Sequence, residues 1–260
     1  MKLLLFDIDG TLLRGHGRGK QALIEAMQAS IDDRGCTHLF GAGEGRRALG
    51  EAPLAAPEVQ TNPGMQNGIA GKTDLQFVHE SLGPELTDAA IAEMIPQIFA
   101  EHSRRLREYF TAAAGVELLD GVRELLEEVQ RLHRSGERCL PAVLTGNIQA
   151  GANIKLKVFG LEPYFVLGAY GDEGRVRREL PPIAVQRARD LTGRDFAGAD
   201  VVIIGDTPND IDCGRPLKAR TIAVTTGPYA RDELAEHEPH AIFDSLADTD
   251  RVLSAIFADD

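Results

Sequence analysis

The stretch LLLFDIDGTL, residues 3–12, joins a run of apolar residues to two carboxylates and a glycine. A short continuous apolar run is typical of a strand that is buried on both faces of a parallel sheet. Open sheets of this kind bind ligands beyond the carboxyl ends of their strands, which is where Asp7 and Asp9 stand. Gly10 lets the backbone turn away sharply at this point. The stretch therefore predicts a buried strand that ends in an acidic site.

Short apolar runs recur along the chain and alternate with segments of helical periodicity. The predicted strands are Lys2–Phe6, Leu140–Leu144, Tyr164–Leu167, Val201–Ile204 and Thr221–Val224. The predicted helices between them are Val122–His133, Gln149–Phe159, Ile183–Leu191 and Asn209–Leu217. Alternation of strands and helices is typical of a parallel sheet with helices on both faces. We therefore expect an α/β fold with a doubly wound parallel sheet.

The alternation is interrupted between about residues 15 and 115. The helical patterns of this segment fall at Gln21–Ile31, Asp74–Ser81 and Asp88–Tyr109, without a strand of comparable quality. Residues 36–68 are rich in Gly, Ala and Pro, as in a long functional loop. The sequence thus predicts an α/β core domain of residues 1–14 and 116–260 and an inserted helical domain of residues 15–115.

Composition narrows the class of partner. The formal net charge of -12 would repel a nucleic-acid backbone, and no basic run offsets it, so we expect no nucleic-acid partner. The cysteines are few and widely spaced, which predicts a reducing compartment rather than a disulfide framework. No apolar run approaches membrane-spanning length, and the apolar start is too short for a signal peptide. We expect a cytoplasmic protein with no membrane partner.

The predicted strand Leu140–Leu144 is followed by Thr145, Gly146 and Asn147. This sequence places a hydroxyl and a flexible backbone at the start of a helix, where free N–H groups bind phosphate oxygens. Alone, such a sequence is more often a helix cap or a turn. The three residues are nevertheless candidate phosphate ligands.

The predicted strand Val201–Ile204 is followed by GDTPND at residues 205–210. Asp206 and Asp210 are spaced i and i+4 across a strand end and a first helical turn, so both can face one cation. A helix cap at Asp206 would leave Asp210 unexplained. Three strand ends are therefore expected to converge on one site.

Together these motifs resemble those of the haloacid dehalogenase-like superfamily of hydrolases. The matching stretches are DIDGTL at residues 7–12, LTGN at residues 144–147 and GDTPNDI at residues 205–211. The inserted segment resembles the α-helical cap of the phosphoglycolate-phosphatase-like members. The resemblance implies a Rossmann-like core that carries a cap domain.

The resemblance also implies roles for individual residues. Asp7 would be the nucleophile and Asp9 the general acid/base, and Thr145 would bind phosphate. Asp206 and Asp210 would hold Mg²⁺ together with Asp7 and the carbonyl of Asp9.

One motif departs from the family pattern. The family has a basic residue, commonly Lys before Pro, ahead of the helix that precedes the last acidic strand. Here residues 175–181 read RVRRELP. Counting back from Ile183 favours Arg177, with Arg178 as the alternative. Arg keeps the charge and offers a bidentate fork to phosphoryl oxygens.

The chemistry of these residues favours a phosphatase. A carboxylate attacks a dianionic phosphate poorly until a cation neutralises the repulsion, and Mg²⁺ suits an all-oxygen set of ligands. The leaving alkoxide needs a proton and the later water needs a base, and Asp9 can serve both steps. We expect a Mg²⁺-dependent phosphatase that hydrolyses a small-molecule phosphate ester through an aspartyl-phosphate on Asp7.

Other functions share parts of this pattern. A phosphosugar mutase would use the same core residues and protect the aspartyl-phosphate from water. A dehalogenase does not need the protonatable group that Asp9 supplies. A catalytically silent binding protein is the alternative from another class, and the intact carboxylates argue against it.

Lys72 is the candidate substrate residue of the insert. It lies in Gly71-Lys72-Thr73-Asp74, which resembles a cap loop that often approaches the substrate. A closing cap would bring this cation to the phosphate or the leaving group. A solvated loop lysine is the alternative. We expect specificity to lie in the insert, with Arg46 and Arg47 as a further pair that can face an anionic group.

Overall fold

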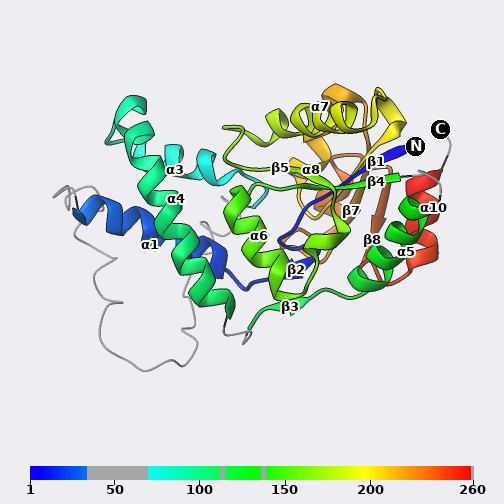
Figure 1. The fold of residues 1–260 in the computed structure, drawn as a ribbon, viewed down its shortest axis with the longest axis horizontal. Coiled ribbons are helices and arrows are strands. Elements are labelled where there is room, and N and C mark those ends of the chain that lie inside the picture. Colours follow the sequence, from blue (N-terminus) through cyan, green and yellow to red (C-terminus); the bar gives the residue numbers. More distant parts are fainter. Residues whose placement is uncertain (34–69, 112–114, 136–138, 259–260) are drawn as a thin grey trace.

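The computed structural model describes residues 1–33, 70–111, 115–135 and 139–258. Its centre is a six-stranded sheet in the order β5-β4-β1-β6-β7-β8, in which every neighbouring pair is parallel (Figure 1). The strands are β1 (Lys2–Phe6), β4 (Cys139–Leu144), β5 (Leu167–Ala169), β6 (Val201–Gly205), β7 (Arg220–Val224) and β8 (Ala241–Phe243). This order places β1 between β4 and β6.

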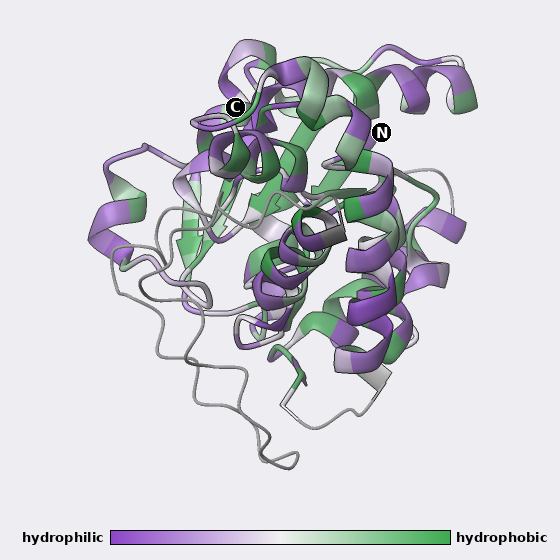
Figure 2. Ribbon diagram, turned by 90° about the vertical axis from the view of Figure 1, so that its left-hand side faces the viewer, coloured by the Kyte–Doolittle hydropathy of each residue, from purple (hydrophilic) through white to green (hydrophobic). Residues whose placement is uncertain are grey.

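Helices cover both faces of the sheet. Alternate residues of β1 point to opposite faces, so Leu4 and Phe6 belong to one apolar cluster and Leu3 and Leu5 to another. The first cluster packs α5 (Val122–Arg134), α6 (Gln149–Val158) and α10 (Thr249–Phe257) against the sheet. The second packs α7 (Leu180–Thr192) and the short α8 (Pro208–Cys213) against the other face. The predicted doubly wound α/β fold is confirmed. Figure 2 shows hydrophobic residues concentrated in the strands of the central sheet.

The helix α5 illustrates why the sequence folds in this way. Its buried residues recur at helical spacing and are Val122, Leu125, Leu126, Val129 and Leu132. Burying each such side chain stabilises the fold by about 1.5–3 kcal/mol. The helix starts at Gly121, where φ is 79° and a Cβ atom would lie 2.2 Å from the Cα atom of Ala247. Only glycine fits both the backbone angle and the space.

Three helices of the inserted segment pack on one another beside the sheet (Figure 1). They are α1 (Arg18–Asp33), α3 (Asp74–Leu82) and α4 (Asp88–Thr111), and we refer to them as the insert helices. Their apolar faces form a cluster of their own, with Met27, Val78 and Ile98 fully or almost fully buried. The insert is therefore helical in its described parts, as the sequence predicted.

A two-stranded antiparallel ladder lies where the chain leaves and re-enters the main sheet. It pairs β2 (Leu13–Arg14) with β3 (Glu117–Leu118). The boundaries predicted from the sequence, after residue 14 and before residue 116, fall at this ladder. The division into two domains stays a prediction, and the separate apolar cluster of the insert helices supports it.

Two predicted elements are wrong in their extent. Residues 162–164 form a 3-10 turn that contains Pro163, and β5 begins only at Leu167. Pro163 fixes φ and favours a helical turn over the strand predicted there. The helix predicted over residues 209–217 ends at Cys213, since Gly214 and Pro216 follow and Pro216 has no N–H to continue it. The short β2, β3, β8 and α9 (Arg231–Ala235), and α10 near the end, were not predicted.

Some predictions concern residues that the structure does not describe. The loop 36–68, with Arg46, Arg47 and Cys36, lies outside the described residues. In the described ranges, Cys139 and Cys213 are buried, and no disulfide joins them. The helices of the described part include no segment of sufficient length and hydropathy to cross a membrane.

Candidate active site

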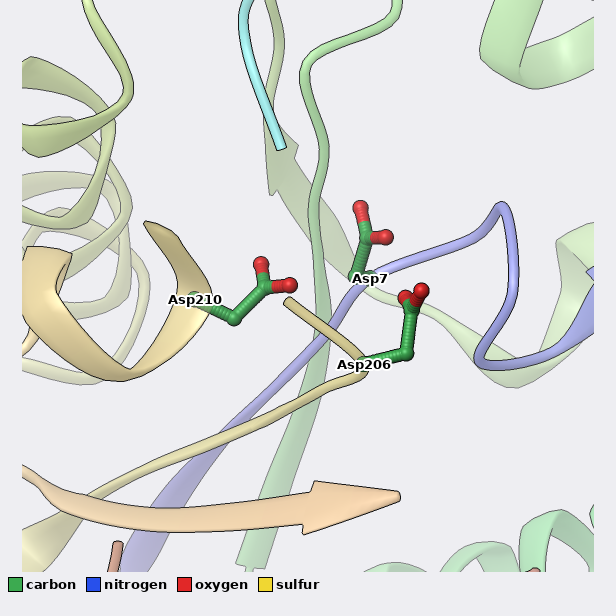
Figure 3. Close-up of side chains that lie close together, drawn as sticks. All are labelled: Asp7, Asp206 and Asp210. Carbon is green, nitrogen blue, oxygen red and sulfur yellow. The ribbon is translucent and has the colours of Figure 1, made fainter. Parts of the chain in front are cut away.

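Three neighbouring strands deliver the predicted acidic and polar residues to one edge of the sheet. Asp7 follows β1, Thr145 follows β4 and Asp206 follows β6, and all three are buried. Asp210 joins them from the first turn of α8. Figure 3 shows the carboxylates of Asp7, Asp206 and Asp210 gathered around a common space. One oxygen atom from each of these carboxylates lies within 4.8 Å of the others.

The backbone around Asp206 is shaped to leave its carboxylate in place. Thr11 donates a hydrogen bond of 3.0 Å from Oγ1 to Oδ1 of Asp206. Gly10 has a φ of 84°, and a Cβ atom there would lie 2.3 Å from Oδ2 of Asp206. A Cβ atom at Gly227 would lie 1.8 Å from the same oxygen. Side chains at either glycine would therefore displace the carboxylate.

Asp210 has a second, structural role. Its Oδ2 accepts hydrogen bonds from the backbone N–H of Thr207 at 3.0 Å and from its hydroxyl at 2.7 Å. This is a capping box in which Thr207, and not Asp206, caps α8. A carboxylate has about four lone-pair positions, so Asp210 keeps capacity for a cation.

Arg177 supplies the positive charge at this edge. It lies on a 3-10 turn before α7 and is 5% exposed. Its Nη2 donates to Oδ1 of Asp7 at 3.0 Å and to the carbonyl of Leu144 at 2.9 Å, and it pairs with Oδ1 of Asp210. Arg178 is exposed. The structure thus places Arg177 at the site and Arg178 outside it. A single nitrogen of Arg177, Nη2, makes all three contacts. The guanidinium group therefore does not bind these protein groups in the bidentate way that the sequence suggested for phosphoryl oxygens.

Burial dominates the electrostatics of the acidic group. Loss of solvent raises the pKa of Asp7 to about 7, against the lowering effect of Arg177. Loss of solvent also raises the pKa of Asp206 well above its usual range, and the neighbouring charges of Asp7 and Asp210 add to this effect. Ionised together, these three carboxylates carry more negative charge than the one guanidinium group of Arg177 neutralises. The donor set therefore fits a hard divalent cation such as Mg²⁺, which binds carboxylate oxygens.

These raised pKa values predict how the stability of the metal-free protein depends on pH. The folded state keeps the proton of Asp7 up to about pH 7, whereas the unfolded state loses it near the ordinary aspartate pKa of 3.8. The stabilising contribution is therefore complete below the unfolded pKa and is lost as the pH rises through the folded pKa. We expect the melting temperature in EDTA to fall between roughly pH 5 and pH 8. Mg²⁺ should reverse most of the fall. A melting temperature that rises over this range in EDTA would contradict the prediction.

Asp9 lies apart from the acidic group and contacts two other residues. Its Oδ2 accepts a hydrogen bond from Nδ2 of Asn147 at 2.7 Å and lies 2.5 Å from Nζ of Lys155. Asn147 thus turns its side chain to Asp9, and its predicted role as a phosphate ligand stays a prediction. Lys155 was missed from the sequence. The sequence did contain one signal for Lys155: it is a charged residue on the buried face of α6, next to Ala152 and Leu156.

The loop before α3 packs directly on the loop after β4. The N–H of Asp74 donates to the carbonyl of Gly146 at 2.7 Å, and Oδ2 of Asp74 accepts from the N–H of Ile148 at 2.9 Å. A Cβ atom at Gly146 would lie 2.0 Å from the carbonyl oxygen of Lys72. The insert and the predicted phosphate-binding loop are therefore in close contact.

A cavity of about 850 Å³ opens over these groups. Asp7, Asp9 and Asp206 line it together with Thr145 and Gly146. The basic side chains around it, histidine included, are Arg14, His16, Lys20, Lys72, Lys155 and Arg177. Basic side chains in the lining of a cavity that also holds an acidic metal-type site suit an anionic ligand.

Lys72 lines the same cavity. Its Nζ lies 2.6 Å from Oε2 of Glu80 on α3, and its side chain is 26% exposed. The structure therefore brings Lys72 to the candidate site, where its ammonium group pairs with Glu80.

The chain is similar in sequence and in fold to known hydrolases. The family model described as haloacid dehalogenase-like hydrolase matches residues 1–217. A phosphoglycolate phosphatase of Vibrio vulnificus (strain CMCP6) is 24% identical over 250 residues, covering 95% of this chain and 93% of the relative. Pyrophosphatase PpaX of Anoxybacillus flavithermus is 24% identical over 175 residues, covering 67% of this chain and 73% of the relative. The crystal structure of a hydrolase from Pseudomonas syringae has a TM-score of 0.61 and 19% identity, covering 99% of this chain and all (100%) of that chain.

Proposed function

The chain belongs to the haloacid dehalogenase-like hydrolase family, and from this premise we propose that it is a Mg²⁺-dependent phosphatase of small-molecule phosphate esters. The predicted family is thereby confirmed, and the phosphatase relatives support the predicted phosphoglycolate-phosphatase-like branch. One observation carries the proposal. Asp7 lies buried beside Arg177 and two further carboxylates, while Asp9 faces the same cavity two residues later.

In the proposed mechanism a carboxylate oxygen of Asp7 attacks the phosphorus atom of the ester. The bond from phosphorus to the ester oxygen breaks, and its electron pair stays on that oxygen. Asp9 donates a proton to the same oxygen, so an alcohol leaves and an aspartyl-phosphate remains on Asp7. Water then attacks the phosphorus, Asp9 accepts its proton, and the bond to Asp7 breaks. Inorganic phosphate leaves, and both carboxyl groups return to their starting states.

The other residues of the site support these steps by binding and orientation. Arg177 donates a hydrogen bond to Oδ1 of Asp7, which orients the nucleophile. The positive charge of Arg177 also opposes the rise in the pKa of Asp7 that burial causes. The hydroxyl of Thr145 and the backbone N–H of Gly146 would bind phosphoryl oxygens. Asp7, Asp206, Asp210 and the carbonyl of Asp9 would hold Mg²⁺, which when bound supplies positive charge against the dianionic phosphate.

The features of the chain favour a small substrate. The cavity is lined in part by α1 and by the residues that lead into α3, and its volume of about 850 Å³ suits a small molecule. Its cationic side chains favour an ester with anionic character beyond the phosphate. The relatives named as acting on phosphoglycolate and pyrophosphate are consistent with such substrates. The cytoplasmic location predicted from the sequence is part of this proposal.

A panel of phosphorylated metabolites tests the proposed function. Each compound is incubated with the protein and Mg²⁺, and inorganic phosphate is measured. We expect release from at least one small phosphate ester, and no release in EDTA. Full activity in EDTA would contradict the metal dependence. Isomerisation of a sugar phosphate without phosphate release would identify a mutase instead.

Lys72→Ala tests the role of the insert. If Lys72 leaves Glu80 to contact the substrate, kcat/KM for the best ester of the panel should fall by about tenfold or more, which is about 1.4 kcal/mol of transition-state stabilisation. The loss should be smaller for p-nitrophenyl phosphate, because this substrate uses few contacts with the insert. Glu80→Gln is the matched control, since it frees the ammonium group without removing it. Equal kinetics for Lys72→Ala and wild type would place Lys72 outside the reaction.

A further inference from the structure

Lys155 is buried on α6, although lysine is rarely buried in proteins. Its side chain is 3% exposed. Its Nζ lies 2.5 Å from Oδ2 of Asp9 and 2.6 Å from Oδ1 of Asn147. A buried ammonium group costs free energy unless it is paired and hydrogen-bonded, so these contacts determine where the Lys155 side chain lies.

We propose that Lys155 is a positioning residue that fixes the orientation of the Asp9 carboxylate for proton transfer. This inference rests on the proposed function, in which Asp9 exchanges protons with the ester oxygen and with water. It concerns a residue that belongs to none of the three sequence motifs.

The three side chains form a closed set of hydrogen bonds. Asn147 donates from Nδ2 to Oδ2 of Asp9 and accepts from Lys155 at Oδ1. Its Nδ2 also donates to Oγ1 of Thr145 at 2.7 Å. The orientation of the Asn147 amide is therefore fixed at both ends. Asp9 is linked in this way both to α6 and to the loop after β4.

The contacts to Asp9 are asymmetric. Both Lys155 and Asn147 bind Oδ2, and within the described ranges Oδ1 has no hydrogen bond. The side chain of Asp9 remains 43% exposed and lines the cavity. The carboxylate is thus held by one oxygen while the other is available to a reacting group. Proton transfer requires an approach of about 2.6–3.2 Å, so fixing this rotation matters for the rate.

The surroundings of Lys155 restrict its ammonium group to this position. The ring of Phe110 on α4 lies 5.7 Å from Nζ, a distance suited to a cation–π contact. A Cβ atom at Gly19 on α1 would lie 2.8 Å from Nζ, so glycine leaves the room that the ammonium group occupies. Two insert helices therefore lie against the ammonium group of Lys155.

A comparison of leaving groups tests the inference. An alkyl phosphate needs a proton on its leaving oxygen, whereas p-nitrophenolate leaves readily without one. For Lys155→Met, kcat/KM should fall about tenfold or more for an alkyl phosphate and about threefold or less for p-nitrophenyl phosphate. The ratio of the two values does not depend on the folded fraction of the variant, so partial unfolding does not imitate the effect. Lys155→Arg should restore part of the ratio.

A double-mutant cycle asks whether Lys155 acts through Asp9. In an Asp9→Asn background, Lys155→Met should lower kcat/KM for the alkyl phosphate no further, because the group that it orients is gone. Lys157→Met is the matched control, since Lys157 lies on the same helix and is exposed. Lys157→Met should leave kcat/KM unchanged for both substrates.

The outcomes separate this inference from the proposed function. If wild-type protein with Mg²⁺ releases phosphate from neither substrate, the proposed function fails. The positioning role is overturned if wild type is active and Lys155→Met lowers kcat/KM by the same factor for both substrates. It is also overturned if Lys155→Met lowers kcat/KM in the Asp9→Asn background by as much as it does in wild type. Should Lys155→Met not fold, Lys155→Gln provides the same comparison, because it removes the charge and keeps a hydrogen-bond donor.

Discussion

Asp7→Asn should lower phosphate release by about 10⁴-fold or more, because it removes the group that forms the covalent intermediate. The amide has nearly the same size as the carboxylate, and its oxygen can still accept the hydrogen bond from Nη2 of Arg177. It also removes a buried charge that solvent loss disfavours. We therefore expect the fold to persist, with a melting temperature in EDTA at pH 8 close to that of the wild type or above it.

The measurement pairs phosphate release with thermal unfolding of the same preparation. Asp250→Asn is a matched control, since Asp250 is exposed in the first turn of α10. This control should change neither activity nor stability. Turnover by Asp7→Asn at the wild-type rate would show that another residue attacks phosphorus.

Arg177→Ala has the second large effect that we expect. Removing one partner of a buried ion pair leaves the remaining charge without compensation and typically costs about 3–5 kcal/mol. Here Asp7 and Asp210 both lose their pairing cation, and the carbonyl of Leu144 loses a donor. The pKa of Asp7, already raised by burial, should rise further and reduce the ionised nucleophile. Both the free energy of unfolding and kcat should therefore fall.

Two further variants separate charge from position. Arg178→Ala removes an exposed arginine one residue away and should change stability by no more than about 0.5 kcal/mol. Arg177→Lys should keep much of the activity, because a single nitrogen of Arg177 makes the three contacts and an ammonium group has three donors. Stability and kinetics of the three variants check this order. A larger loss from Arg178→Ala than from Arg177→Ala would contradict the assignment.

The alternation of apolar runs and helical segments was enough to predict the parallel sheet and the strand ends that carry the acidic residues. Strand ends are readable because a buried strand is continuously apolar and its first polar residue is conspicuous. The three-residue β8 is too short for such a pattern. The extent of β5 was misread because Pro163 lies in a 3-10 turn that includes Tyr164, the first residue of the predicted strand.

The sequence could not separate residues whose roles depend on tertiary contacts. Arg177 and Arg178 are adjacent and chemically identical, and only the packing of the turn before α7 buries one and exposes the other. The contact of Asn147 with Asp9 joins residues 138 positions apart. The sequence indicates only that Lys155 belongs to an amphipathic helix. Its contact with Asp9 is visible only in the folded structure. Asp210 lies close to Asp7 and Asp206, and its part in the cap of α8 became visible only in the backbone geometry.

Trapping the intermediate tests the central claim most directly. Wild-type protein is mixed with its best substrate and Mg²⁺, quenched during turnover, and treated with borohydride, which reduces an acyl phosphate at the carboxyl group that carries it. Peptide mass spectrometry then locates the reduced residue. We predict reduction at Asp7 that requires both substrate and Mg²⁺ and is absent from Asp7→Asn. Reduction at another carboxylate, or sustained phosphate release without any reduction at Asp7, would contradict the account.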